Sequence, residues 1–373
     1  MAIHPGKILR QKMEEKGWTQ DELAAITGLS RQTIYFIIRG KSNITPETAA
    51  RLAAAFGNPP EEWVKWDGLF RLANMEHDRE IEQVSRLAYL YSLAPIRDLQ
   101  KRGWISEEFV DAEGLESELK KFFGTDSLDG ELTFPVATRR SLHTLKLNAS
   151  EKAWCFQARR LAVKLPLPVG FNPKLLDHAE KKLRQLAAYR KLASHVHEVL
   201  AEYGIRFVVV EPIPNVRIDG ATFWLDTEPV IAMSLRHDRI DGFWFTLMHE
   251  FAHVRNGDAS VDSDLIDGTK GIATTLVEDE TELTANEMAA ASLIKPNEMK
   301  SFIARVGPLY ARERVIQFAH KQKIHPGIIV GQLQRRNEIG YSALRDLLVK
   351  VRDLVVPVAF TDGWGQSVSP AIM

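Results

Sequence analysis

The sequence His249-Glu250-Phe251-Ala252-His253 combines residue types and a spacing that suit a metal site. On an α-helix the two histidines lie on one face about 6 Å apart along the axis, so both imidazoles can reach one cation. Glu250 can then hydrogen-bond a metal-bound water and act as a general base. The motif therefore predicts a divalent metal centre with hydrolytic chemistry, in which His249 and His253 are ligands and Glu250 is catalytic.

The third ligand is expected from another segment, because a hydrolytic zinc site usually has three protein ligands and one open position. Residues 277–294 predict a helix whose apolar face includes Leu283 and Ala289, and Glu282 lies at the edge of that face. Glu282 is therefore the expected third ligand, with Glu278, one turn earlier, as the alternative ligand or a support for the ligands. Zinc is the expected cation, and Mn²⁺ or Fe²⁺ stays open because His and Glu suit several divalent ions.

Three further residues carry groups that can take part in chemistry. Arg236 or His237 can stabilise a tetrahedral oxyanion, with a surface position as the alternative for His237. Cys155, the single cysteine, is interpreted as a small core residue, and a role as nucleophile is the weaker interpretation.

A second chemical pattern lies near the N-terminus, where two short helices are predicted on either side of a glycine turn. Thr19 caps the first helix, Ser30 caps the second, and Gly28 supplies the turn between them. Two helices joined in this way present the second one for insertion into the major groove of DNA. The residues predicted to face DNA are Gln20, Arg31, Gln32, Thr33 and Tyr35.

The side chains at these positions can form hydrogen bonds that distinguish one base from another. Arg31 and Gln32, in the first turn of the second helix, can make bidentate contacts with guanine and adenine. Thr33 and Tyr35 are nearby candidates, and Gln20 is better placed for a phosphate. The alternative is a helical bundle whose polar residues merely face water.

The segments that must position the metal ligands predict a mostly α fold with a small mixed β-sheet. Three short runs rich in β-branched and aromatic residues, 206–211, 221–226 and 229–234, predict strands. They precede a helix at about 239–255, which its apolar flanks indicate to be buried. The remaining segments have mainly helical patterns, and the tail after Val355 is expected to be irregular.

Length and composition limit the classes of protein to consider. A chain of 373 residues predicts two or three domains, and 45% hydrophobic residues exclude wholesale disorder. The sequence has no apolar run long enough to span a membrane and no apolar segment of a signal peptide. A single cysteine cannot form an internal disulfide, so a cytoplasmic protein is expected. The net charge of −1 neither favours nor excludes a nucleic-acid partner.

The N-terminal segment carries four strings, at 3–6 (IHPG), 18–20 (WTQ), 29–34 (LSRQTI) and 44–49 (ITPETA). Through them residues 3–74 resemble the XRE-type helix-turn-helix of HigA antitoxins, a domain of five helices. The resemblance implies a homodimer on palindromic operator DNA, with Gln20, Arg31, Gln32 and Thr33 facing the DNA. It also implies autorepression of a toxin–antitoxin operon, with a RelE-like toxin as partner.

Further strings surround the histidine motif, at 218–221 (IDGA), 234–236 (SLR), 243–253 (FWFTLMHEFAH) and 282–290 (ELTANEMAA). Through them residues from about 180 to 296 resemble the ImmA/IrrE-like metallopeptidases. The resemblance implies a zincin-like α+β fold and places the third metal ligand on Glu282. Residues 95–105 and 318–333 resemble parts of long HigA-type proteins that join both modules.

These patterns predict four segments with different tasks. The segments are a helix-turn-helix domain at 1–75, a helical linker region at 76–178, a zinc-peptidase domain at 179–296 and a helical region at 297–373. The expected function is that of a DNA-binding regulator and antitoxin of HigA type that represses its own operon. The alternative is a zinc-dependent endopeptidase that cleaves a repressor or toxin, and a third interpretation is a binding module with a structural metal.

Overall fold

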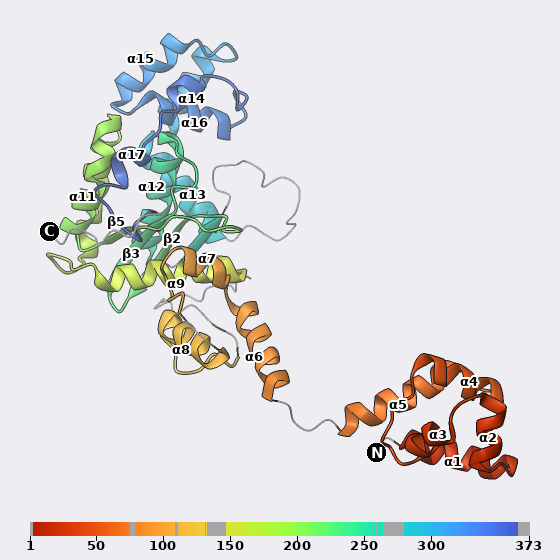
Figure 1. Cartoon of the computed structure of the whole chain (residues 1–373). Coiled ribbons are helices and arrows are strands. Elements are labelled where there is room, and N and C mark those ends of the chain that lie inside the picture. Colours follow the sequence, from red (N-terminus) through yellow and green to blue (C-terminus); the bar gives the residue numbers. More distant parts are fainter. Residues whose placement is uncertain are drawn as a thin grey trace. The chain divides into compact units, whose positions relative to one another are not determined.

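The computed structural model describes residues 3–74, 79–108, 111–130, 132, 147–258, 260–263 and 280–364. The chain divides into two compact units, residues 1–86 and 87–373 (Figure 1). Helices form most of the described structure, and a small mixed sheet lies in the second unit. The predicted class, mostly α with a small mixed sheet and an N-terminal helix-turn-helix, is confirmed at this level.

The first unit consists of helices, and side-chain caps fix the first residues of four of them. Thr19 Oγ1 accepts a hydrogen bond from the Glu22 backbone N–H, and the Glu22 carboxylate accepts one from the Thr19 N–H. Ser30 caps the next helix through the Thr33 N–H, and Gly28 adopts the left-handed φ of 68° that the turn requires. The helices are α1 (Pro5–Lys16), α2 (Gln20–Thr27), α3 (Arg31–Ile38), α4 (Pro46–Phe56) and α5 (Pro60–Asn74), with α6 (Arg79–Leu93) after them.

A core of its own stabilises the first unit. Leu9, Leu23 and Leu52 pack together with Ile34 and Trp63, and each of these side chains is fully buried. Burying one aliphatic side chain contributes about 1.5–3 kcal/mol, so these contacts hold the short helices together. Ile34 lies on the inner face of α3, which leaves the outer face of that helix to polar residues.

The second unit combines helices with a five-stranded mixed sheet of order β4-β2-β3-β1-β5. The strands are β1 (Arg206–Val209), β2 (Ile218–Leu225), β3 (Glu228–Met233), β4 (Ser260–Ser263) and β5 (Phe360–Thr361). β2 pairs antiparallel with β3 and β4, and β1 runs parallel to β3 and β5. The three predicted strands are confirmed. The tail after Val355, predicted to be irregular, contributes β5. The sequence does not reveal this strand, because two residues are too few to show a periodic pattern.

Helices make up most of the rest of the second unit. They are α7 (Ile96–Lys101), α8 (Ala112–Phe123), α9 (Ala149–Lys164), α10 (Leu176–Leu186), α11 (Val196–Glu202), α12 (Ile240–Asn256), α13 (Glu280–Leu293), α14 (Pro296–Val306), α15 (Arg312–Gln322), α16 (Pro326–Arg335) and α17 (Arg352–Val355), with the 3₁₀ turns η1 (Pro173–Leu175), η2 (Arg190–His195) and η3 (Arg345–Leu347). Among the described residues, no helix is long and apolar enough to cross a membrane.

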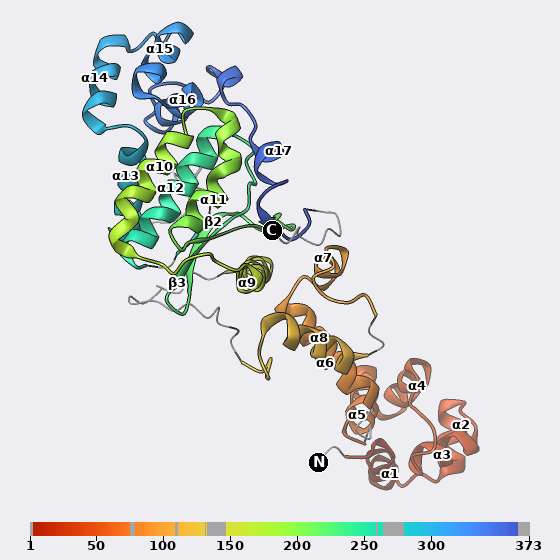
Figure 2. The same cartoon turned by 90° about the vertical axis from the view of Figure 1, so that its left-hand side faces the viewer.

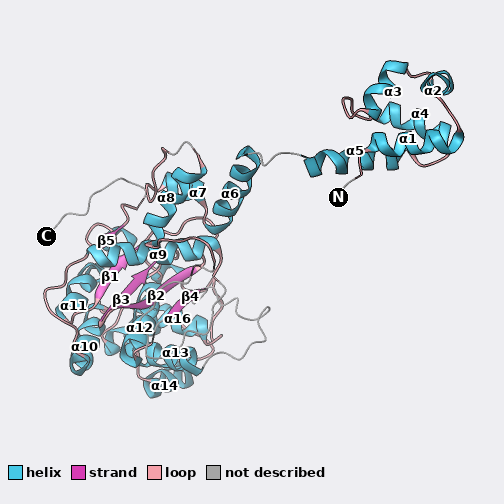
Figure 3. Ribbon diagram, turned by 90° about the horizontal axis from the view of Figure 1, so that it is seen from below, coloured by secondary structure: helices cyan, strands magenta, loops and turns pink. Residues whose placement is uncertain are grey.

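Both faces of the sheet are covered by helices. Phe207 and Val209 of β1 point into one core and Val208 into another, because alternate residues of a strand face opposite sides. Figures 2 and 3 show α9 on one side of the sheet and α10, α11 and α12 on the other. The sheet therefore separates two cores, one against α9 and one against α12.

These two cores draw on stretches that lie far apart in the sequence. Leu119 and Trp154 belong to the core against α9, while Val315 and Leu333 belong to the core against α12. Packing therefore joins the described residues from 87 onward in one unit. The domain boundaries predicted within this unit stay a prediction. Cys155 lies in the first of these cores, where burial raises the pKa of its thiol, so its interpretation as a core residue is confirmed.

Candidate metal centre and DNA interface

The motif lies on α12, a helix that is buried on all sides. Every residue from Ile240 to Val254 is buried, as the apolar flanks of the motif predicted. His249, Glu250 and His253 are themselves fully buried. Burying polar groups is costly unless they are paired, so three of them in one buried helix indicate a specific purpose at this position.

The structure brings the three predicted ligands together. His249 Nε2 and His253 Nε2 lie 3.0 Å apart, and the carboxylate of Glu282 on α13 lies 3.3 Å from the first and 3.5 Å from the second. Within the described residues, these are the His, Cys, Asp and Glu side chains that gather closely enough to share a cation. Glu278, the alternative ligand, lies outside the described residues.

The spacing of these donor atoms fits a small divalent cation. Tetrahedral ligands that each lie 2.0–2.1 Å from zinc are about 3.3 Å from one another. The three separations in the structure, between 3.0 and 3.5 Å, lie around this value. Two imidazole nitrogens and one carboxylate oxygen also form a donor set that zinc accepts. His249, His253 and Glu282 therefore fit the metal that the sequence predicts.

Glu282 faces α12 because of its place on α13. Ala285, Ala289 and Leu293 form the buried stripe of that helix, and Glu282 lies on the same side, half-buried. The prediction that Leu283 belongs to the apolar face is wrong, since 44% of this residue is exposed. With about 100° per residue, Leu283 points away from the side on which Ala285 lies.

The carboxylate of Glu250 is held by the neighbouring strand β2. Thr222 Oγ1 donates to Glu250 Oε2 over 2.8 Å, in a fully buried position. Gly220 on the same strand leaves space for this carboxylate, because a Cβ atom there would lie 2.4 Å from Glu250 Oε1. Thr222 is a residue that the sequence did not single out, although it lies within a predicted strand.

Arg236, one candidate for oxyanion stabilisation, binds a carboxylate of β2 instead. Its Nε and Nη2 atoms lie 3.1 and 3.3 Å from the two carboxylate oxygens of Asp219. Arg236 follows β3 in the chain, and Asp219 precedes Gly220 on β2, so this bidentate pair links the two strands. Arg236 therefore helps to position β2, the strand that contacts Glu250. His237, the other candidate, is half-buried in the loop before α12.

The predicted DNA-facing residues lie on α2 and α3. Arg31, Gln32 and Tyr35 are exposed, whereas Gln20 and Thr33 are half-buried. Thr33 Oγ1 lies 2.8 Å from the hydroxyl of the capping residue Ser30. The outer face of α3 thus offers a guanidinium, an amide and an aromatic hydroxyl to a partner.

Two contacts orient the exposed side chains of this face. Arg31 forms an ion pair of 3.3 Å with Asp21, and both side chains are about two-thirds exposed. An exposed pair of this kind is worth at most about 1 kcal/mol, so it does not prevent Arg31 from binding DNA. Arg39 lies 5.7 Å from the centre of the Tyr35 ring, which adds a second cation to the face.

Comparison with known proteins gives matches for the N-terminal part of the chain. The family model described as helix-turn-helix matches residues 9–63. The uncharacterized HTH-type transcriptional regulator YddM of Escherichia coli K12 is 28% identical over 89 residues, which are 23% of this chain and 95% of that protein. Virulence-associated protein I of Dichelobacter nodosus is 34% identical over 80 residues, 21% of this chain and 74% of that protein.

A third relative, an uncharacterized HTH-type transcriptional regulator of Haemophilus influenzae, is 32% identical over 79 residues, 21% of this chain and 74% of that protein. No solved structure matches the chain. The matches to these relatives agree with the capped helices and the polar outer face of α3. Through its N-terminal unit, the chain belongs to the XRE-type helix-turn-helix family of DNA-binding transcriptional regulators.

Proposed function

We propose that this DNA-binding regulator is also a zinc-dependent endopeptidase, whose reaction takes place in its second unit. The observation that supports the proposal is the convergence of His249, His253 and Glu282 around one point, with Glu250 in the same buried helix. A structural zinc site needs no adjacent carboxylate held in place by another element. Glu250 has that support from Thr222, and this favours catalysis.

The residues of the second unit have distinct tasks in this proposal. His249, His253 and Glu282 would hold the cation, which when bound would supply Lewis-acid polarisation of a peptide carbonyl. Glu250 would accept a proton from the attacking water and pass it to the leaving amine. Thr222 and Gly220 fix the direction of the Glu250 carboxylate, which a general base requires.

The substrate we propose is a protein, a repressor or a toxin, that meets the regulator at its operator. Binding to DNA would then bring the peptidase to the place where such a repressor acts. A second candidate is a HigA-type antitoxin that represses its own operon as a homodimer and binds a RelE-like toxin. The exposed polar face of α3 favours the operator-binding part of this second candidate.

The test begins with metal content, measured by mass spectrometry on the full chain. Wild type and Glu250→Gln are expected to contain about one zinc per chain, because both retain all three ligands, while His253→Ala should lose it. Cleavage of a quenched fluorescent peptide library should then require both metal and Glu250. A wild type that binds no zinc when supplied with it would overturn the proposed enzyme and leave the regulator.

A further inference from the structure

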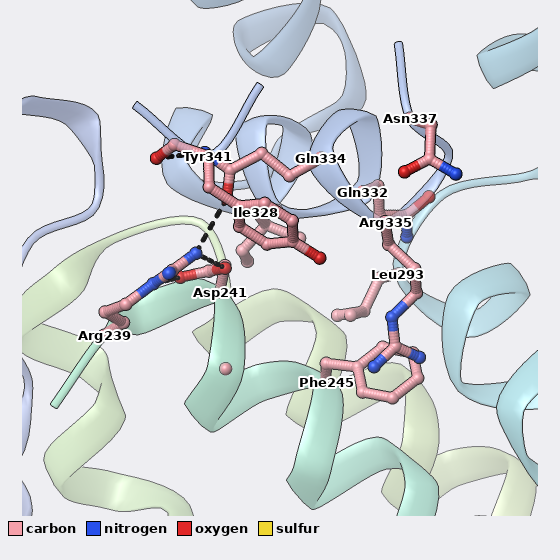
Figure 4. A pocket seen from close by; sticks show the side chains of 12 residues that line it. Arg239, Asp241, Phe245, Leu293, Ile328, Gln332, Gln334, Arg335, Asn337 and Tyr341 are labelled. Carbon is pink, nitrogen blue, oxygen red and sulfur yellow. Dashed lines mark hydrogen bonds and ion pairs between the residues drawn. The ribbon is translucent and has the colours of Figure 1, made fainter. Parts of the chain in front are cut away.

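A cavity of about 160 Å³ lies between α12 and α16. Figure 4 shows Arg335 of α16 lying over the ring of Phe245, with Gln332 next to Arg335 and the ring of Tyr341 on the side of Asp241. Arg239 and Asp241 form another part of its lining. This cavity contains none of the proposed metal ligands, so it is distinct from the metal centre itself.

The cavity nevertheless adjoins the metal centre on two helices. Phe245 precedes His249 by one turn of α12, and the centres of the two rings are 6.1 Å apart. On α13, Asn286 follows Glu282 by one turn, and its Oδ1 accepts a hydrogen bond of 3.4 Å from Arg335 Nη1. A peptide lying across the metal ligands would therefore have a neighbouring side chain within reach of the cavity.

The charged residues that line the cavity are Arg239, Asp241 and Arg335. Asp241 accepts two hydrogen bonds from the Arg239 guanidinium, of 3.1 and 2.7 Å, and its negative charge also acts on Arg335. Arg335 has its guanidinium carbon 3.4 Å from the centre of the Phe245 ring, a contact that fixes the plane of the cation. Although residue 335 as a whole is exposed, desolvation of its guanidinium lowers the pKa to about 10, so it stays charged at neutral pH.

Gln332 supplies an acceptor to the same wall. Its side-chain Nε2 donates to the carbonyl of Ala290 over 3.1 Å, which settles the orientation of the amide. Its Oε1 is buried and has no hydrogen-bond partner among the described residues. Leaving a buried acceptor unsatisfied is unfavourable, so this oxygen is suited to accept from a donor such as a peptide N–H.

We propose that this cavity is a specificity subsite for an acidic residue, Glu or Asp, next to the bond that is cleaved. The carboxylate would bind the planar fork of Arg335, and a peptide N–H would bind Gln332 Oε1. A cavity of about 150 Å³ accommodates benzene, and the Glu side chain has fewer non-hydrogen atoms than benzene. The inference rests on the proposed peptidase function and adds the class of sequence that it cleaves.

The experiment measures binding of fluorescein-labelled peptides by anisotropy to the zinc-loaded Glu250→Gln chain. Three peptides of Ala, Gly and Ser differ at one central position, which is Glu, Gln or Lys. We expect the Glu peptide to bind at least about ten-fold more tightly than the Gln peptide, and the Lys peptide to bind most weakly. Equal affinities of the three peptides would overturn the inference without any further variant.

Matched variants assign the preference to one side chain. Arg335→Gln should remove the difference between the Glu and Gln peptides, whereas Arg336→Gln, which changes an exposed neighbour outside the cavity, should keep it. A preference that survives in Arg335→Gln would contradict the assignment. Zinc content and peptide cleavage by wild type separate the two proposals. Arg335-dependent binding without cleavage would overturn the peptidase alone, and metal-dependent cleavage without acidic preference would overturn the subsite alone.

Discussion

Glu250 owes its orientation to a hydroxyl that comes from another element. Thr222 Oγ1 lies 2.8 Å from Glu250 Oε2 and 3.0 Å from the backbone oxygen of the same residue. Gly220, two residues earlier on β2, allows the strand to approach the carboxylate closely. A base that is held in one direction before the substrate arrives needs no reorganisation during the reaction.

Removing this hydroxyl tests its role directly. Thr222→Val keeps the shape of the side chain but deletes the donor to Glu250, so the folded state should lose about 1–3 kcal/mol and peptide cleavage should fall. Zinc content should stay at the wild-type value, because no ligand changes. Urea unfolding and cleavage rates check this, with the exposed Thr284→Val as control. Unchanged cleavage in Thr222→Val would argue against a positioning role.

At the scale of elements, the proposed metal ligands come from two helices that lie apart in the sequence. His249 and His253 belong to α12 and Glu282 to α13, and both helices contribute to the same core. A cation shared by them would act as a cross-link that binds the folded state alone. Metal binding is therefore expected to stabilise this pair of helices.

Removing the metal should lower the melting temperature of the chain. At a free zinc concentration 100 times Kd, binding contributes about 2.7 kcal/mol, which corresponds to a shift of about 5–10 °C. Thermal unfolding with zinc and with a chelator measures the shift. His253→Ala should show none, while Glu280→Gln, an exposed neighbour of Glu282, should behave as wild type. A chelator-insensitive wild type would contradict the cross-link.

The same three residues, His-Pro-Gly, begin two helices in different units. His4 Nδ1 accepts from the Gly6 N–H over 2.9 Å, and His325 Nδ1 accepts from the Gly327 N–H over 3.1 Å. Both glycines lie against backbone, since a Cβ atom would be 2.4 Å from the Ile37 oxygen and 2.5 Å from the Leu347 oxygen, respectively. An accepting imidazole must be neutral at this nitrogen, so the cap depends on pH.

Burial is the largest cause that lowers the pKa of His325 below 6.5 in the folded chain. The unfolded chain therefore takes up the proton first, so this residue should add stability above pH 6.5 that is lost as the pH falls through the folded value. His325→Asn keeps a good helix cap without a titrating group. Urea midpoints at pH 7.5 and 5.5 should differ less in His325→Asn than in wild type. An equal difference would show that this cap does not titrate.

Helix α3 gives a prediction about base recognition rather than about stability. Arg31→Ala and Gln32→Ala remove exposed groups of α3, so each should weaken specific DNA binding by about 1–3 kcal/mol and relax the choice of base at one position. Sites selected from random oligonucleotides provide the DNA, and titration at fixed salt gives the affinities. Lys16→Ala, at the exposed end of α1, is the control for general charge. An equal loss of affinity for all DNA sequences would indicate that Arg31 contacts a phosphate and not a base.

At the scale of the whole molecule, the chain joins a DNA-binding unit to a second unit that carries the proposed metal ligands. The core of the first unit includes Leu23, Ile34 and Trp63, and its described members all lie between Ile8 and Trp66. The cores of the second unit lie on the two faces of the sheet. Loss of the metal centre should therefore leave the DNA-binding surface intact.

This separation predicts that DNA binding and metal binding fail independently. His253→Ala should retain the wild-type affinity for a selected DNA site within about two-fold, because no residue of α3 changes. Arg31→Ala should likewise keep its zinc. DNA titration and metal analysis on the same preparations check the DNA affinity and the zinc content of both variants. A large loss of DNA affinity in His253→Ala would reveal coupling between the units.

The sequence by itself determined the features that depend on neighbouring residues. Thr19 and Ser30 predict the caps they form, since an N-cap bonds an amide two or three positions on. The spacing of His249 and His253 predicts that they share a helix face, because four residues make about one turn. The interpretation of Glu282 as the third ligand rests on local periodicity on α13 together with the family resemblance, and it stays a prediction.

The tertiary structure decided the contacts between distant parts of the chain. Thr222 reaches Glu250 across 28 positions, and Arg335 stacks on Phe245 from a helix that the sequence assigned to a separate region. No periodicity records such pairs, because a residue's partner on another element depends on how strands and helices pack. The contact between Thr222 and Glu250 and the proposed acidic subsite thus form only when α12, β2 and α16 pack together.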